Sequence, residues 1–274
     1  MSTNDQKQQA RAKREQAQAA AEAAAKRNRN LQILAGLVFA AVLVVVAVVI
    51  IGGSGNKQQG TGGAAHGDSV QGIAETKSLL AGIEQDGLTL GDPKAPVTIL
   101  EFLDVQCPYC RQHQLDEQPK VISQLVKTGK ARLTVQPIAL PQMGEDSEAG
   151  RTVALRLSKQ NVAWNFLNLF YWNQGDEQTG YVTDDYLKNL VAAVSKTTTG
   201  VKTTDADAAR DPDDAIKVSL TKIDDLSTKL GVSATPSFAI GKTGRAASTY
   251  KLLQLNGTES TASQLAAAVA DFEG

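Results

Sequence analysis

Residues 33–51 (ILAGLVFAAVLVVVAVVII) form a run of 19 residues without a charged or strongly polar side chain. This is about the length that a helix needs to cross a hydrocarbon core of roughly 30 Å. A helix that is apolar all round can also lie in the core of a large protein, but here a glycine-rich tract follows at once. The run therefore predicts a transmembrane helix.

The charges on either side of this run predict its orientation. Residues 1–30 carry seven Lys and Arg against three acids, a net charge of +4, which leaves −5 for the rest of a chain whose net charge is −1. Positive charge is retained on the cytoplasmic side, so residues from about 52 onward are expected outside the cell membrane. A cleaved signal peptide is the alternative, but its apolar region is usually about 7–15 residues long. An uncleaved signal-anchor in the lipid bilayer is favoured.

Four segments follow along the chain: a basic cytoplasmic segment (1–30), the single transmembrane anchor (31–52), a flexible glycine-rich linker (53–78) and an extracytoplasmic folded domain (79–274). A flexible linker of this length keeps the domain close to the membrane surface. The domain, at about 200 residues, is large enough to bury a core without disulfides. Its acidic balance gives no reason to expect a nucleic acid as a partner.

The domain begins with a strand–helix–strand pattern. Residues 97–105 (VTILEFLDV) form a nearly continuous apolar, β-branched run, typical of a strand buried on both faces. Pro108 suits the first position of a helix, which makes Cys107 the N-cap, and Pro119 predicts an interruption within that helix. Residues 131–140 predict the second strand, and residues 87–91 (GLTLG) a short edge strand before the pattern. This order indicates an α/β fold.

The chain has only two cysteines, Cys107 and Cys110, and this pattern places them at the turn between strand and helix. The unpaired N–H groups of a helix N-terminus stabilise an anion, so we expect the pKa of Cys107 to fall and its thiolate to become the reactive species. A loop this short gains little from a structural bridge. The pair therefore predicts a reversible, catalytic disulfide.

Metal binding is the other interpretation of the two thiols. His113 lies three residues after Cys110, so Cys107, Cys110 and His113 supply three candidate ligands. A structural zinc site requires four, and the only other histidine, His66, lies in the predicted linker. We therefore predict no metal and no other cofactor, and expect His113 to be a partly exposed helix residue.

The run TILEFLDVQCPYC, followed far downstream by GVSATPSFAIG (231–241), resembles the membrane-anchored, DsbA-like branch of the thioredoxin superfamily. The resemblance extends from about residue 87 to the C-terminus. It implies a thioredoxin fold in which a helical insertion, about residues 141–230, separates the two halves of the core. Its motif Cys-Pro-x-Cys includes Pro108 and Tyr109.

The resemblance also implies roles for particular residues. Pro236 matches a cis-proline that faces the two cysteines, and Thr235 the residue whose backbone pairs with a bound substrate chain. Glu101 matches a buried acid that exchanges a proton with the second cysteine. From the residues alone, alternatives stay open: a trans Pro236 that simply opens a strand, and a Glu101 that reaches solvent or pairs with a lysine.

The resemblance implies an extracytoplasmic thiol–disulfide oxidoreductase that introduces disulfides into exported proteins with free thiols. It further implies reoxidation by a quinone-linked membrane partner of the DsbB or vitamin K epoxide reductase type. Tyr109 stands where the best-known oxidants carry histidine, and Thr235 is also a choice of isomerases and reductases, so a reductase or isomerase is one alternative. A non-catalytic, membrane-tethered binding domain is the other.

The segment expected as an insertion has helical patterns at 150–175, 183–196 and 213–231, so we expect about three helices. The first ends in an aromatic cluster that we assign to the core rather than to a binding groove. Thr183 is a good N-cap and Gly231 a good stop signal. Two more strands, over 237–241 and 249–257, and a terminal helix over 261–273 complete the predicted fold.

Overall fold

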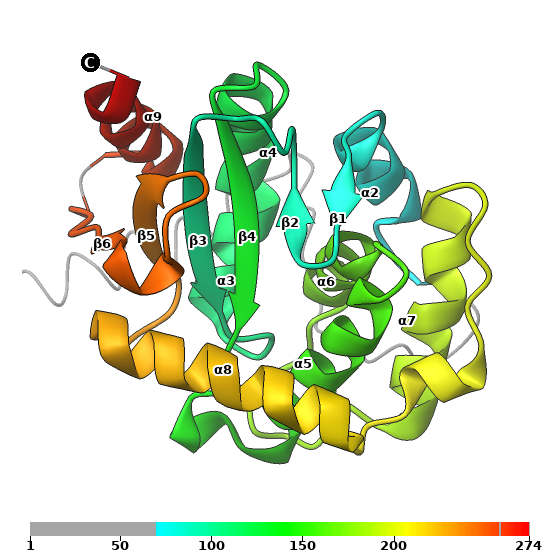
Figure 1. Cartoon of the computed structure of the whole chain (residues 1–274). Coiled ribbons are helices and arrows are strands. Elements are labelled where there is room, and N and C mark those ends of the chain that lie inside the picture. Colours follow the sequence, from blue (N-terminus) through cyan, green and yellow to red (C-terminus); the bar gives the residue numbers. More distant parts are fainter. Residues whose placement is uncertain (1–69, 258, 274) are drawn as a thin grey trace, which may run out of the picture. The chain divides into compact units, whose positions relative to one another are not determined.

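The computed structural model describes residues 70–257 and 259–273, which belong to one compact unit (Figure 1). The predicted cytoplasmic segment and transmembrane anchor, and most of the predicted linker, lie outside these residues. Within the described part, no helix has the length and apolar character needed to cross a bilayer. The anchor, its orientation and the segment boundaries stay predictions from the sequence.

A six-stranded mixed sheet runs through the domain in the order β1-β2-β4-β3-β5-β6. Its centre is β3 (Val97–Leu103), which pairs in parallel with β4 (Ala131–Pro137) and antiparallel with β5 (Ser237–Lys242). All seven residues of β3 are buried, as its apolar, β-branched sequence predicts. Because both neighbours cover its edges and helices cover its faces, β3 is a rigid base for the residues that follow it.

The outer strands are short. On one side, β2 (Thr89–Leu90) pairs with β4, and β1 (Gln85–Asp86) pairs with β2. The strand predicted over 87–91 is therefore present but does not form the edge, because β1 lies outside it. On the other side, β6 (Lys251–Leu252) is much shorter than the strand predicted there.

The helical path after β3 confirms the predicted strand–helix–strand unit. It begins as α3 (Pro108–Gln112), continues through a π-helical stretch (His113–Glu117) into α4 (Gln118–Val121), and ends in a second π-helical stretch (Ile122–Val126). The backbone N–H of Gln118 bonds the carbonyl of His113, five residues back. The widened turn thus takes up the interruption predicted at Pro119, whose ring removes an N–H from the helix.

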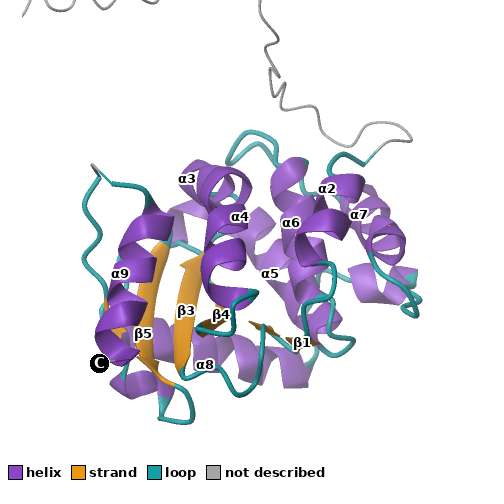
Figure 2. Ribbon diagram, turned by 90° about the horizontal axis from the view of Figure 1, so that it is seen from above, coloured by secondary structure: helices purple, strands orange, loops and turns teal. Residues whose placement is uncertain are grey.

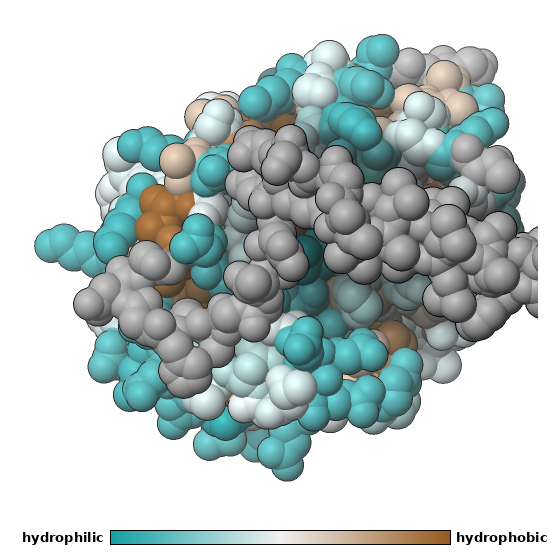
Figure 3. All heavy atoms as spheres, turned by 180° about the vertical axis from the view of Figure 1, so that it is seen from behind, coloured by the Kyte–Doolittle hydropathy of each residue, from teal (hydrophilic) through white to brown (hydrophobic). Residues whose placement is uncertain are grey.

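Two layers of helices cover the sheet (Figure 2). One layer contains α3, α4 and the terminal α9 (Thr261–Glu273), which packs against α4 and β5. The other contains α8 (Asp214–Leu230), which covers a second apolar cluster that includes Leu100 and Phe102 of β3. Seen from behind, the described residues present a mostly hydrophilic surface with small apolar patches (Figure 3).

Four helices, rather than about three, lie between β4 and β5: α5 (Gly144–Ser158), α6 (Ala163–Trp172), α7 (Asp184–Thr197) and α8. The first predicted helix is two helices, because the chain turns between them at Asn161, whose φ is 58°. Asparagine tolerates this left-handed conformation better than most residues. The Thr183 cap and the Gly231 stop are confirmed, since Thr183 accepts a hydrogen bond from Tyr186 N and Gly231 has φ 75°.

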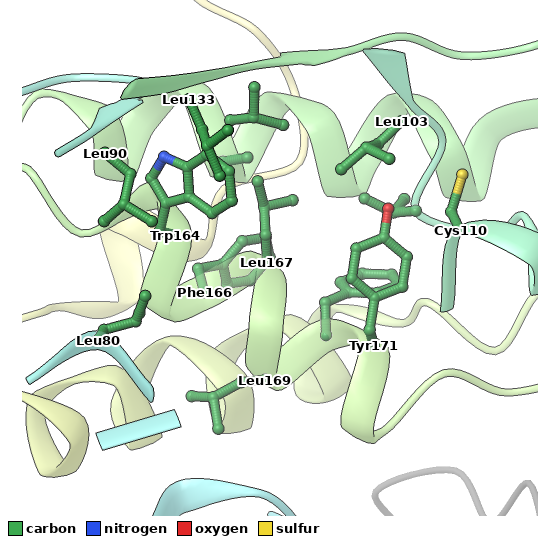
Figure 4. Packing of buried hydrophobic residues seen from close by; sticks show 14 of the residues in the cluster. Leu80, Leu90, Leu103, Cys110, Leu133, Trp164, Phe166, Leu167, Leu169 and Tyr171 are labelled. Atoms are coloured by element: carbon green, nitrogen blue, oxygen red, sulfur yellow. The ribbon is translucent and has the colours of Figure 1, made fainter. Parts of the chain in front are cut away.

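The aromatic cluster is core, as predicted. Trp164, Phe166 and Phe170 of α6 are buried, and Tyr171 lies near Leu103 and Cys110 at one end of this core (Figure 4). An unpredicted helix, α2 (Ile73–Leu80), packs against α6 and α7. It includes residues that the sequence assigned to the linker, because its eight residues carry only a weak apolar face.

Glu117 joins the active-site helix path to α9. Its carboxylate accepts hydrogen bonds from Lys120 Nζ, Ser260 Oγ and, at 3.1 Å, Ala262 N in the first turn of α9. The hydrogen bond from Lys120 and then that from Ser260 lower its pKa to about 2. Because its folded-state pKa is depressed, Glu117 stabilises the fold above about pH 4.5, and this contribution is lost as the pH falls toward 2.

We expect Glu117→Gln to lower the free energy of unfolding at pH 7 by about 1 kcal/mol, because the negative charge is lost and only one of the two acceptor oxygens remains. It should also flatten the pH dependence of stability between about pH 5 and 2. Urea denaturation, followed by the fluorescence of Trp164 and Trp172, measures both effects. Glu177→Gln, at an exposed position of the α6–α7 loop, is the control. Equal stability and equal pH dependence in the two variants would contradict the role given to Glu117.

Candidate active site

Cys107 lies in the turn between β3 and α3 and is the N-cap of α3, as predicted. Its backbone is extended, with φ −67° and ψ 121°, and Pro108 occupies the first helical position. Cys107 N donates to Asp104 O at 3.1 Å, and Cys107 O accepts from Arg111 N at 3.1 Å. The turn is therefore fixed on both sides of the cysteine.

The two thiols are free, and they differ in their surroundings. Cys107 is 3% exposed and Cys110 is fully buried, whereas Tyr109 between them is 70% exposed. Burial raises the pKa of Cys110 well above its usual value, so this cysteine holds its proton in the dithiol form.

The pKa of Cys107 is lowered to about 6, chiefly by the hydrogen bond that its sulfur accepts from the Cys110 thiol. Burial opposes this effect, but the Thr235 hydroxyl and the backbone N–H groups of Cys110 and Tyr109 add to it. The predicted lowering of the Cys107 pKa is confirmed in direction. Its largest cause, however, is the second thiol, and the helix N-terminus contributes less.

The loop before β5 faces the cysteines, although it lies far from them in the sequence. The Thr235–Pro236 peptide bond is cis, so the trans alternative does not hold. The Cys107 thiol donates a hydrogen bond to Thr235 O, with 3.4 Å between Sγ and the oxygen. Thr235 Oγ1 is buried and makes no hydrogen bond with the described residues, and the Thr235 side chain helps to lower the pKa of Cys107. The structure thus brings Thr235 and Pro236 to the cysteine pair.

Glu101 is fully buried in the middle of β3, beneath the helix path that carries the cysteines. Its side chain does not face solvent, and no lysine of the described residues pairs with it. Its Oε2 accepts from Gln114 Nε2 at 3.4 Å and Gln118 Nε2 at 3.3 Å, and its Oε1 lies 3.8 Å from His113 Nε2. The carboxyl is thus enclosed by polar side chains of one helical face.

The expectation that His113 is partly exposed is wrong. His113 is 4% exposed, and its ring meets Phe238 edge-on at 4.9 Å between centroids. Its Nε2 is 2.9 Å from Gln118 Oε1, which can only accept, so Nε2 carries a proton. His113 follows the buried Cys110 by three residues, a spacing that places both on one helical face. This spacing is a sequence signal that could have suggested burial, although the packing against Phe238 decides it.

Sequence reasoning missed Asp104, which is fully buried at the end of β3. It accepts hydrogen bonds from Gln106 N at 2.9 Å, Leu140 N at 2.7 Å and Ser147 Oγ at 2.5 Å. Burial raises its pKa, against these hydrogen bonds. Asp104 thereby joins the active-site turn to the start of the inserted helices.

Sequence reasoning also missed Tyr171 and Gln174, near the end of α6. Tyr171 donates its hydroxyl to Asp104 O at 3.1 Å, and Gln174 Nε2 donates to Val105 O and Cys107 O. Nothing in their local sequence marks them, because their partners are backbone carbonyls 67 to 69 positions away. In the described residues no cluster of three or more His, Cys, Asp or Glu is arranged for a metal ion.

These features agree with comparisons to known proteins. A model of the thioredoxin family matches residues 84–255, which is more than half of the chain. The chain belongs to the thioredoxin family. The match includes the cysteine turn, Glu101, Thr235 and Pro236.

Among curated proteins, this thioredoxin-family chain is similar to probable disulfide bond formation protein D of Bacillus cereus, with 31% identity over 105 residues. That match covers 38% of the chain and 48% of the relative. Disulfide bond formation protein D of Bacillus subtilis is 25% identical over 151 residues, which cover 55% of the chain and 66% of that protein. The chain thus spans about half to two thirds of these relatives' length.

Among solved structures, oxidised BdbD from Bacillus subtilis matches with a TM-score of 0.53 and 21% identity, over 69% of this chain and 94% of that one. Alpha-DsbA1 from Wolbachia pipientis matches with a TM-score of 0.50 and 22% identity, over 72% and 95%. At these identities the likeness concerns the fold. The expected thioredoxin fold with helices inserted between β4 and β5 is confirmed.

We expect Thr235→Val to raise the pKa of Cys107 from about 6 by roughly half a unit to one unit, because the hydroxyl donor is lost while the shape is kept. A depressed folded-state pKa stabilises the dithiol protein fully above about pH 9, and this contribution disappears as the pH falls to 6. The variant should therefore lose stability in that window. The ultraviolet absorbance of the thiolate, measured against pH, gives the pKa, and an unchanged midpoint would refute the role of the hydroxyl.

Proposed function

We propose that this protein is a thiol–disulfide oxidoreductase that introduces disulfides into exported proteins. The observation that carries this proposal is the asymmetry of the cysteine pair. Cys107 has its pKa lowered to about 6, whereas burial keeps Cys110 protonated. The similarity to proteins named for disulfide bond formation supports the same activity.

The reaction starts from the oxidised enzyme. A substrate thiolate attacks Cys107 Sγ, the Cys107–Cys110 bond breaks, and Cys110 leaves as a thiolate that takes up a proton. A second substrate thiolate then attacks the substrate sulfur of the mixed disulfide and releases Cys107 as a thiolate. The substrate dithiol loses two electrons, and the enzyme disulfide gains them. A leaving thiol of low pKa departs faster, so the second step benefits from the surroundings of Cys107.

The stabilised thiolate also favours the direction of oxidation. An interaction that stabilises the dithiol form makes the disulfide a stronger oxidant. In the dithiol form the Cys107 thiolate is stabilised by the Cys110 thiol, the Thr235 hydroxyl and two backbone N–H groups. Tyr109 faces solvent, so its side chain does not replace the histidine that the best-known oxidants carry at this position. The Thr235 hydroxyl supplies one of the donors in its absence.

The other site residues receive roles that their positions support. Thr235 and Pro236 would present backbone groups to an extended substrate chain next to Cys107. Glu101, buried beneath the same helix path, would exchange the proton of Cys110. Pro108 and Tyr109 form the turn that a substrate meets first.

The predicted anchor and the charge of its flanks support a location at the cell membrane, with the N-terminus in the cytoplasm and the catalytic domain outside. A short linker would hold the domain near a quinone-linked membrane protein of the DsbB or vitamin K epoxide reductase type. Such a partner would oxidise the Cys107–Cys110 dithiol again after each cycle.

The reduction potential tests the direction of electron flow. We expect the purified protein, equilibrated in glutathione buffers, to lie near the oxidising end of the family scale, at around −120 mV. The reason is the stabilised Cys107 thiolate. A value near −270 mV would instead identify a reductase.

We expect Cys110→Ala to accumulate mixed disulfides through Cys107. Its Cys107 thiolate can attack a substrate disulfide and release the other substrate sulfur as a thiolate, and no Cys110 thiol remains to attack Cys107 Sγ and free the bound substrate. Non-reducing gels of cells that make this variant should show adducts of high mass. A variant that lacks both cysteines is the control and should show none. If Cys110→Ala is folded and forms no adducts, the protein is a binding domain rather than an enzyme.

A further inference from the structure

Gln174 follows α6 and reaches the cysteine turn from the inserted helices. It is only 8% exposed, and its amide nitrogen donates to Val105 O at 2.6 Å and to Cys107 O at 3.2 Å. One side-chain NH₂ group thus joins two backbone carbonyls on either side of Gln106. Gln174 therefore holds the turn between β3 and α3 by hydrogen bonds, although it belongs to neither of these elements.

The neighbours of Gln174 hold the same turn. We define the anchor segment as residues 171–178. Gln178 N donates to Gln106 Oε1 at 2.9 Å, and the amide nitrogen of Gln106 in turn donates to Met143 O at 2.5 Å. From the other side, Arg111 Nε donates to Tyr171 O at 3.0 Å. The anchor segment therefore connects the turn to the inserted helices at three positions, Tyr171, Gln174 and Gln178.

The orientation of the Cys107 backbone decides which groups reach its sulfur. The backbone N–H groups of Tyr109 and Cys110, in the first turn of α3, help to lower the pKa of Cys107, although its side chain makes no capping hydrogen bond. Their direction relative to Sγ depends on the extended N-cap conformation of Cys107. The Cys107 carbonyl has a helical donor in Arg111 N and a second donor in Gln174. Without Gln174, buried carbonyl groups of the turn lose a donor, and turning the peptide planes is the way to recover one.

We propose that Gln174 is a positioning residue, which holds the carbonyls of Val105 and Cys107 so that the donors of α3 stay aligned on the Cys107 sulfur. The proposal deepens the proposed function and rests on it, because it names what keeps the reactive thiolate stabilised. It assigns the inserted helices a share in the redox chemistry. Gln174 touches no reacting atom and acts only through the backbone of Cys107.

The test uses the full chain, purified in detergent in its dithiol form. Gln174→Met keeps the length and bulk of the side chain but has no N–H donor. We expect the Cys107 titration midpoint, followed by thiolate absorbance, to rise by at least half a unit. The ratio of thiolate to thiol at pH 6 would then fall about threefold. The disulfide should become a weaker oxidant in the same glutathione buffers.

Gln160→Met is the matched control. Gln160 is a part-buried amide of the inserted helices, and it donates to Asp207 Oδ1 at 2.9 Å, away from the cysteines. This variant should keep the wild-type midpoint. If Gln174→Met does not fold, Gln174→Asn replaces it, since its shorter amide cannot span both carbonyls and should raise the midpoint in the same way.

The proposal is overturned if folded Gln174→Met keeps the wild-type midpoint of the Cys107 titration. Where Gln174→Met does not fold, a wild-type midpoint in Gln174→Asn overturns it. An equal rise of the midpoint in Gln160→Met also overturns it. Failure of the proposed function gives a different result. In that case the wild-type protein itself titrates near the ordinary thiol value, and Cys110→Ala traps no adducts.

Discussion

The Cys107 sulfur depends on hydrogen bonds from two separate parts of the chain. The thiol of Cys110 and two backbone N–H groups come from α3, whereas the hydroxyl of Thr235 comes from the loop before β5. The sheet brings these parts together, because Phe102 near the end of β3 pairs with Ser237 at the start of β5. A shift of this register by one residue would turn the side chains of β5 to the opposite face of the sheet. The chemistry of the thiol is therefore a consequence of strand pairing.

Burial acts on both cysteines with the same sign, and the hydrogen bonds decide the difference between them. Desolvation raises the pKa of each thiol, but only Cys107 has enough donors to overcome it. Cys110, one helical turn further in, donates a hydrogen bond to the Cys107 sulfur and is shut off from solvent. One residue is thus prepared to be attacked and the other to hold its proton. A single turn of helix separates the two roles.

Local signals were sufficient for the parts of the fold that depend on neighbouring residues. The buried run of β3, the N-cap Cys107 with Pro108 behind it, and the helix signals at Thr183 and Gly231 could all be read from the sequence. Tertiary contacts decided the rest. The break at Asn161 and the burial of His113 depend on packing between helices and sheet, and an interior polar cluster around Glu101 leaves no apolar pattern to detect.

The inserted helices are part of the active-site structure, because their side chains hydrogen-bond the turn that carries Cys107. Asp104 bonds Ser147 of α5, Tyr171 bonds Asp104 O, and Gln174 bonds the carbonyls around Gln106. Buried carbonyls need donors, and a turn that leaves a strand for a helix has few of its own. In this chain the donors come from side chains that follow β4 in sequence. The strand–helix turn and the insertion therefore form one polar network. A displacement of α6 would change the hydrogen bond that Gln174 donates to the Cys107 carbonyl.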